Sequence, residues 1–177
     1  MAEFMDTLKI PLDRVGVLIG PKGSLKKELE EETGTKISVD SKEGDVKIEG
    51  NDALGIFTAK EVVKAVGRGF NPDIAKLLIK QDYFFELINI NDYVKTKSSM
   101  ERMKGRIIGA EGKARKTVED LTETFISVYG KTIGIIGFAD NVTAARKAVE
   151  SLLQGSPHSH VYKWLERRRR EIRLGQL

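Results

Sequence analysis

The chain has 177 residues, 40% hydrophobic and 32% charged, which suits one ordinary domain or two small ones. It has no cysteine, no apolar run of membrane-spanning length and no apolar block near its start, so disulfides, thiolate metal sites and a signal peptide are excluded and a cytoplasmic, membrane-free protein is expected. The net charge of +4 divides into −2 over residues 1–70 and +6 over residues 71–177, which favours an anionic partner.

The first half of the chain predicts the order strand, helix, helix, strand, strand, helix. Leu25 and Leu29 recur at helical spacing, with Ser24 as the expected cap of that helix and Gly34 as its stop signal. The expected elements, in chain order, cover residues 5–11, 15–19, 24–33, 36–40, 46–48 and 53–66.

A short linker helix is expected between the two halves, from Asn71 to about Lys80. Asn71 is a plausible cap, and Pro72 falls in the first turn, where proline is tolerated. A helical linker would hold the two halves in a fixed relation.

The second half predicts the same order of elements and adds a basic tail. Trp164, Leu165 and Arg168 have helical spacing, so the tail is expected to dock by one face and to present arginines on another. The alternative is that Trp164 only seals the edge of a core while the arginines stay in water. The expected elements cover residues 84–91, 99–108, 113–122, 125–129, 132–137 and 140–153, with the tail following.

An internal repeat with an offset of 89 residues explains this duplication. The segment Ile19-Gly20-Pro21-Lys22-Gly23 aligns with Ile108-Gly109-Ala110-Glu111-Gly112, and further on Ile37-Ser38-Val39 aligns with Ile126-Ser127-Val128. The chain therefore reads as two copies of one unit, and the domains are expected at residues 1–70 and 83–155, with a linker at 71–82 and a tail at 156–177.

Each copy places Gly-x-x-Gly between two helices, an arrangement suited to phosphate. Glycine lets the backbone approach a ligand closely, and the helix that follows directs its free N–H groups and positive dipole end at the loop. A sugar–phosphate backbone can lie across such a loop, and neighbouring apolar side chains can line a groove for bases. The alternatives are that the glycines only make a tight turn and that the apolar side chains are ordinary core.

The stretches RVGVLIGPKGSLKKELEEETGTKISV and KGRIIGAEGKARKTVEDLTETFISV resemble the KH family. In that family I-G-x-x-G between two helices clamps about four nucleotides of single-stranded RNA. The resemblance implies an α+β fold with two tandem eukaryotic-type (type I) KH domains, each βααββα with a three-stranded sheet packed on three helices. It covers residues 5–69 and 84–155.

The join RGFNPDIAKLLI, the segment GRIIGAEGKARK and the exit GSPHSHVY resemble the Dim-two family, also called partner-of-Nob-one. The resemblance implies a factor for small-subunit ribosome biogenesis in archaea or eukaryotes that binds near the 3′ end of (pre-)ribosomal RNA. It also implies a partnership with the endonuclease that matures this end, or with another ribosome or translation protein.

The residues expected to contact RNA surround the two loops. In the first copy they are Arg14, Val15, Leu18, Gly20, Pro21, Lys22, Gly23, Ser24, Lys26, Lys27 and Ile37. In the second copy they are Lys104, Arg106, Ile107, Gly109, Ala110, Glu111, Gly112, Lys113, Arg115 and Lys116. Glu111 departs from the pattern, because a carboxylate repels phosphate. The tail arginines are expected to offset it; the alternatives are that the second loop binds RNA at a shifted register or binds protein.

No enzyme, cofactor or metal is expected. His158 and His160 are the only histidines, lack supporting carboxylates and are expected on the surface, and no nucleophile or nucleotide-binding motif is complete. The alternatives to a ribosome-assembly factor are a KH-type subunit that recruits RNA for an RNA-degrading or translation assembly, a protein scaffold with vestigial loops, and, with least support, a nuclease.

Overall fold

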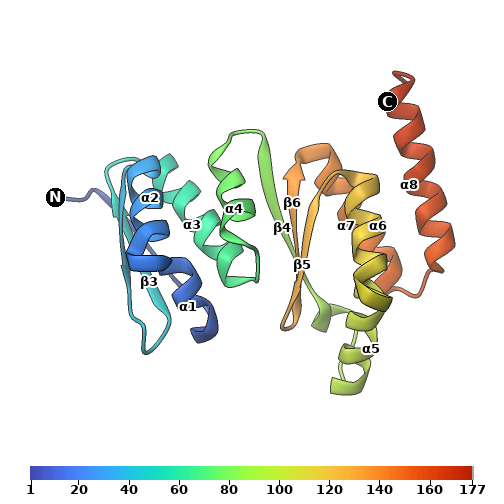
Figure 1. The fold of residues 1–177 in the computed structure, drawn as a ribbon, viewed down its shortest axis with the longest axis horizontal. Helices are drawn as coiled ribbons and strands as arrows, with labels where there is room; N and C mark the ends of the chain where they lie inside the picture. Colours follow the sequence, from blue (N-terminus) through green and yellow to red (C-terminus); the bar gives the residue numbers. More distant parts are fainter. Residues whose placement is uncertain (177) are drawn as a thin grey trace. The chain divides into compact units, whose positions relative to one another are not determined.

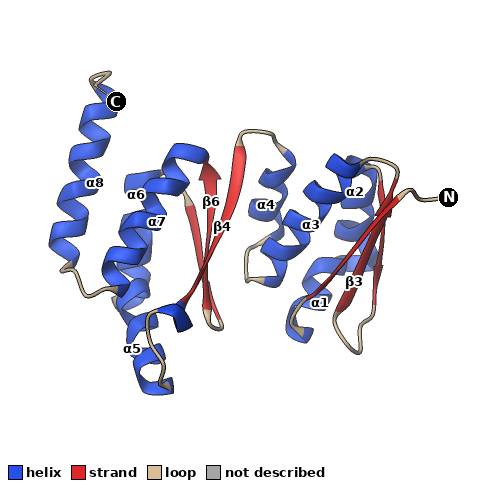
Figure 2. Ribbon diagram, turned by 180° about the vertical axis from the view of Figure 1, so that it is seen from behind, coloured by secondary structure: helices blue, strands red, loops and turns tan. Residues whose placement is uncertain are grey.

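The computed structural model of the protein describes residues 1–176, so Leu177 at the end of the predicted tail lies outside the described residues. The chain forms two compact units, one up to Tyr83 and one from Phe84 onward. Figures 1 and 2 show that each unit has a three-stranded sheet covered on one face by helices. The predicted α+β class is confirmed.

The first unit follows the predicted order of elements. Its sheet has the strand order β1-β3-β2, and β3 pairs antiparallel with both neighbours. The strand β1 ends earlier than predicted, because Pro11 precedes a first helix that is longer than expected. The elements are β1 (Phe4–Lys9), α1 (Leu12–Ile19), α2 (Ser24–Thr33), β2 (Thr35–Val39), β3 (Asp45–Gly50) and α3 (Ala53–Gly67).

Alternation along the strands builds the core of this unit. Val46 and Ile48 of β3 are buried, whereas Lys47 between them is exposed, as expected for a sheet with one covered face. Ile48 lies opposite Ile37 of β2 in the antiparallel register. Burying a side chain of this size contributes about 1.5–3 kcal/mol.

The predicted linker helix is shorter and is built in two parts, α4 (Pro72–Ala75) and the 3-10 turn η2 (Lys76–Ile79). Asn71 caps it as predicted, since its side chain accepts a hydrogen bond of 2.8 Å from the N–H of Asp73. Leu78 is buried, and the Lys76 ammonium lies 3.1 Å from the Glu28 carboxylate on α2. The segment therefore packs on the first unit; the fixed relation of the two units and the domain limits stay predictions.

The second unit repeats the same order, with the sheet order β4-β6-β5. The helix α5 begins earlier than predicted because Thr96, rather than a later residue, caps it by accepting a hydrogen bond from the N–H of Ser99. The elements are β4 (Tyr83–Asn89), α5 (Lys97–Ile108), α6 (Lys113–Thr122), β5 (Phe125–Tyr129), β6 (Thr132–Phe138) and α7 (Ala139–Leu153).

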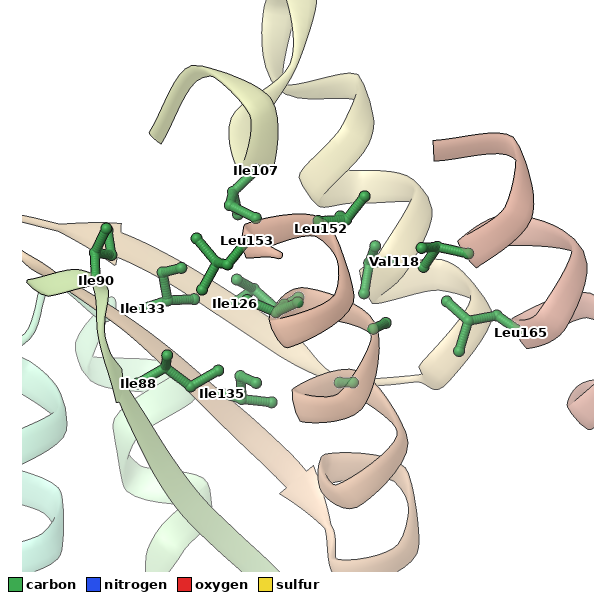
Figure 3. Close-up of a cluster of buried hydrophobic side chains, with 14 of the residues drawn as sticks. Ile88, Ile90, Ile107, Val118, Ile126, Ile133, Ile135, Leu152, Leu153 and Leu165 are labelled. Atoms are coloured by element: carbon green, nitrogen blue, oxygen red, sulfur yellow. The ribbon is translucent and has the colours of Figure 1, made fainter. Parts of the chain in front are cut away.

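The tail forms the helix α8 (His158–Arg173), which is part of the core of the second unit. Leu165 is completely buried, and Figure 3 shows it pointing toward Val118 of α6. Trp164 packs against the same core, and the ammonium of Lys147 lies 5.4 Å from the centre of its ring. The prediction that the tail docks by one face is thus confirmed.

His160 is exposed, as predicted, whereas the surroundings of His158 differ from the expected open surface. His158 is half-buried, and its Nε2 lies 2.9 Å from the backbone oxygen of Arg106, so it fixes the start of α8 to the end of α5.

Among residues 1–176, no group of three or more His, Cys, Asp or Glu side chains is placed to hold a metal ion. None of the helices in that range combines the length and apolar character that crossing a bilayer requires.

Candidate nucleic-acid interface

The two Gly-x-x-Gly loops have nearly the same backbone conformation. Gly20 has φ 75° and ψ 173°, and Gly109 has φ 74° and ψ 175°. The third positions match as well, with φ 55° and ψ 29° at Lys22 and φ 55° and ψ 28° at Glu111. Because residues other than glycine rarely adopt positive φ, the shared strain at this position indicates that both loops are held in one defined shape.

The first glycine of each loop is required by packing. A Cβ at Gly20 would lie 2.9 Å from the backbone nitrogen of Leu25, and one at Gly109 would lie 2.7 Å from that of Ala114. Both contacts are with the first turn of the following helix, which cannot move away from its own loop. These glycines therefore fold the motif and let the two helices meet at a tight angle.

The second glycine of each loop has a different environment. A Cβ at Gly23 would have no neighbour within 4 Å, so its absence leaves open space in front of the first turn of α2. No side chain caps α2 or α6, because Gly23 and Gly112 occupy the cap positions. Ser24 was predicted to cap α2, which is wrong: it is the first residue inside the helix. The N–H groups of Ser24 and Lys113 donate to the backbone oxygens of Pro21 and Ala110 within the loops. What each loop offers an anion is therefore the positive end of the helix dipole, with no capping side chain over it.

Lys22 and Glu111 occupy equivalent exposed positions with opposite charges. Lys22 adds a cation beside the uncapped start of α2, and Glu111 adds a carboxylate beside that of α6. The repulsion between a carboxylate and a phosphate at such a solvated site is worth ~1 kcal/mol. The two loops therefore share a shape but differ in their attraction for phosphate.

A clasp beside each loop repeats with the 89-residue offset. The Glu30 carboxylate accepts hydrogen bonds from the ammonium of Lys26 at 3.1 Å and from the N–H of Ile37 at 2.9 Å. In the second unit Glu119 does the same with Arg115 and with the N–H of Ile126, both at 2.9 Å. Lys26 and Arg115, predicted to contact RNA, are thus already engaged in tying α2 to β2 and α6 to β5.

Burial raises the pKa of the Glu119 carboxyl above its ordinary value of 4.5, although the N–H of Ile126 and the charge of Arg115 act in the opposite direction. Desolvation penalises the ionised form, so this carboxylate is held in place at some cost in free energy. That cost indicates that the clasp has a structural role in its unit.

Two of the predicted RNA-contacting arginines hold helices together. Arg14 donates from Nε to the backbone oxygen of Val66 and from Nη2 to that of Phe70, both at 2.8 Å, at the end of α3. Arg106 donates from Nε to the backbone oxygen of Leu152 at 3.3 Å, and from Nη2 to that of Ser156, at the end of α7. In both units an arginine therefore donates hydrogen bonds to backbone carbonyl groups at and just beyond the end of the equivalent helix, α3 or α7.

Three of the four apolar side chains predicted to floor the groove, Val15, Leu18 and Ile37, are covered by protein, as is Ile107 among the predicted RNA contacts. The fourth, Val39, is half-buried. Leu18, for example, is 0% exposed. The strongly apolar positions of an amphipathic helix or strand are the ones that face the core. The buried residues occupy such positions, so they have no open surface for a base.

The predicted residues that do reach the surface lie around the loops. Pro21, Lys22, Ser24 and Lys27 are exposed in the first unit, as are Ala110, Glu111, Lys113 and Lys116 in the second. Lys104 is half-buried, with its ammonium 4.0 Å from Glu101. It lines an open hollow of about 400 Å³ together with three lysines that the sequence did not single out, because isolated lysines in loops or at a helix start have no spacing signal: Lys95, Lys97 and Lys131.

The family comparisons cover most of the chain. Residues 5–65 match the KH domain family, and residues 84–170 match the eukaryotic-type KH domain (type I) in the form of the second domain of PNO1. The second match extends through most of α8, in agreement with the place of that helix in the core.

Named relatives come from archaea and eukaryotes. A KH domain-containing protein of Methanocaldococcus jannaschii is 47% identical over 96% of this chain and 76% of its own length. The RNA-binding protein PNO1 of Oryzias latipes is 36% identical over 64% of this chain, and the pre-rRNA-processing protein PNO1 of Candida albicans is 36% identical over 63%. The chain spans less than half the length of these two eukaryotic proteins, 48% and 41%.

Two solved structures are similar to this chain over nearly its whole length. Dim2p from Pyrococcus horikoshii is 42% identical, with a TM-score of 0.87 over 93% of this chain and 99% of that one. In a complex from the same organism that contains a/eIF2alpha, aDim2p and rRNA, the matching chain is also 42% identical, with a TM-score of 0.89 over 95% of both chains.

Proposed function

This chain belongs to the Dim2/PNO1 family of KH-domain proteins, and from that membership we propose that it binds single-stranded ribosomal RNA as a factor in small-subunit ribosome biogenesis. The relatives named for RNA binding and pre-rRNA processing support this role, as does the neighbour in a complex with rRNA. We propose the region near the 3′ end of the small-subunit RNA as the target.

One observation carries the proposal: each unit presents an uncapped helix start behind a loop of the same strained shape. No side chain covers the first turn of α2 or α6, and the positive end of each helix dipole favours the negative charge of a phosphate there. A Cβ would meet nothing within 4 Å at Gly23 and only the Arg115 side chain, at 3.8 Å, at Gly112, so a sugar–phosphate backbone can approach both loops closely.

The first loop carries most of the phosphate affinity in this proposal. Lys22 lies beside the uncapped start of α2, and Lys27 is exposed one turn further along the helix. The second loop has the same donors but a carboxylate at Glu111. It therefore contributes less to binding, or holds the strand at a shifted register.

The partners and the location belong to the same proposal. The neighbour bound to both a second protein and rRNA supports a chain that holds RNA while a protein docks on it. We propose the endonuclease that matures the 3′ end as such a protein, and the cytoplasm, where it would meet ribosomal RNA, as the location. The protein itself holds RNA for others and carries out no reaction.

The test uses a single strand of about ten nucleotides from the 3′ end of the small-subunit RNA and compares Lys22→Asp with Lys42→Asp. Lys42 is an exposed lysine in the turn between β2 and β3, so the second variant makes the same charge change away from the loop. We expect Lys22→Asp to raise the dissociation constant several-fold and Lys42→Asp to leave it nearly unchanged. Equal affinities for the two variants would remove the first loop from the binding site.

A further inference from the structure

The helix α8 has two unlike sides. Its inner side carries Val161 and Leu165, which are buried in the second unit, and Arg168, which donates to the backbone oxygen of Asp140 at 3.2 Å and to Oδ1 of Asn141 at 3.1 Å. These contacts attach the helix to α6 and to the start of α7, so α8 is a fixed element of the domain surface.

The outer side carries a row of cations, Lys163, Arg167 and Arg170, here called the α8 stripe. The spacing of four and three residues places them on one face at 100° per residue, opposite Leu165. All three are exposed, and among residues 1–176 no hydrogen bond or ion pair holds their side chains. Glu166 and Glu171 are the acids of this helix, and neither forms a salt bridge in the described part of the chain.

The α8 stripe leads away from the second Gly-x-x-Gly loop: the start of α8 lies near that loop, where His158 contacts the backbone oxygen of Arg106, and Arg168 lies at the start of α7. The helix α6 starts at that loop and rises about 15 Å over its ten residues. Since β5 and β6 carry the chain down and back, α7 starts near the end of α6, and Arg168 bonds there (Figure 1). The expectation that the tail arginines offset Glu111 stays a prediction; charges farther apart than the screening length of about 8 Å at physiological salt would offset each other little.

The chemistry of the α8 stripe suits phosphates better than unpaired bases. A helix surface is convex, and the aromatic residues of α8, Tyr162 and Trp164, pack inward on α6 and α7. Guanidinium groups offer paired donors that match phosphate oxygens. This surface has no aromatic ring or groove to hold an unpaired base, so its cations would contact the phosphate backbone. Double-helical RNA presents these phosphates as a rigid array.

We propose that the α8 stripe binds the backbone of a double-helical RNA segment that adjoins the single strand held by the Gly-x-x-Gly loops. The inference rests on the proposed RNA-binding function and assigns a second contact, which is independent of sequence. The protein would thereby recognise a junction between a helix and a single strand.

The test compares two RNAs and two triple variants. One RNA is a hairpin with a single-stranded 3′ extension, and the other is the extension alone. The first variant replaces Lys163, Arg167 and Arg170 with Gln; the control replaces Lys9, Lys42 and Lys64, three exposed lysines of the first unit, in the same way. Binding is measured at several salt concentrations, and Trp164 fluorescence verifies that the second unit remains folded.

The stripe variant should bind the hairpin RNA about tenfold more weakly, with a salt slope shallower by about two units, and the extension alone as tightly as the parent. An equal loss on both RNAs would place the single strand on α8 and overturn the inference. Unchanged binding of the hairpin would also overturn it and leave the stripe as a solvated surface or a site for an acidic protein. If the parent failed to bind the extension alone, the proposed function would fall, whereas a loss on the hairpin would still support the stripe.

Discussion

Three glycines within eight residues of the second unit should respond differently to the same substitution by alanine: Gly105, Gly109 and Gly112. At Gly109 the φ of 74° with a ψ of 175° is a region open almost only to glycine, which costs about 1–3 kcal/mol for another residue. The added Cβ also lies 2.7 Å from the backbone nitrogen of Ala114, an overpacking worth about 1–3 kcal/mol. We expect Gly109→Ala to destabilise the unit by about 2–6 kcal/mol in total.

Gly112 is left-handed as well, at φ 75° and ψ 12°, but its Cβ would meet only the Arg115 side chain at 3.8 Å. Its replacement should therefore destabilise by about 1–2 kcal/mol. Gly105 lies inside α5, and a Cβ there has no neighbour within 4 Å. Gly105→Ala should stabilise by about 0.5–1 kcal/mol, since alanine is the better helix former.

The assay is urea unfolding followed by the fluorescence of Trp164. It is the one tryptophan of the chain and packs on the core of the second unit, so the signal reports that unit. The expected order of unfolding midpoints is Gly105→Ala, parent, Gly112→Ala and Gly109→Ala, from highest to lowest. Equal losses for the last two variants would refute the argument that the two glycines of the motif have different tasks.

Three further predictions concern charge and connection. Glu111→Lys should tighten binding of a short single strand in a gel-shift titration; no change would indicate that the second loop faces no phosphate. A flexible Gly/Ser segment inserted after Lys80 should weaken binding of an RNA long enough to reach both units, because effective concentration falls, and should leave binding of a short strand unchanged. The raised pKa of Glu119 means that the stability it contributes is present below its ordinary pKa of 4.5 and is lost as the pH rises through the raised value. Glu119→Gln should remove this component of the pH dependence of the Trp164 unfolding transition, and an unchanged pH profile would contradict the burial of this carboxyl.

The elements could be predicted because apolar period and glycine positions mark them locally. Gly34 ends α2 in the left-handed conformation, as expected, whereas Glu123 takes that conformation at the end of α6 without any local signal. The sequence predicted the loops for the same reason, since a glycine pair between two helices is visible in the chain itself.

The parts of the site that the sequence could not predict depend on contacts between distant residues. A buried position and a groove position carry the same apolar side chains, so Leu18 was assigned to the groove although it is core. Arg14 bonds to carbonyl groups more than fifty residues away, and no spacing rule reveals that. Sequence reasoning therefore missed the part that several of these side chains play in the fold, and their contacts with RNA stay predictions.

The burial of Leu165 has a consequence for synthesis. The first unit is complete in sequence once the chain has passed Tyr83, so it can fold while the remainder is being made. Leu165, one of the completely buried side chains of the second unit, can join the core only after it has left the ribosomal tunnel. A nascent chain interrupted before that residue would expose the faces of α6 and α7 that α8 covers, and protein quality control can recognise such exposed apolar surface. The chain would therefore acquire its second unit late and nearly all at once.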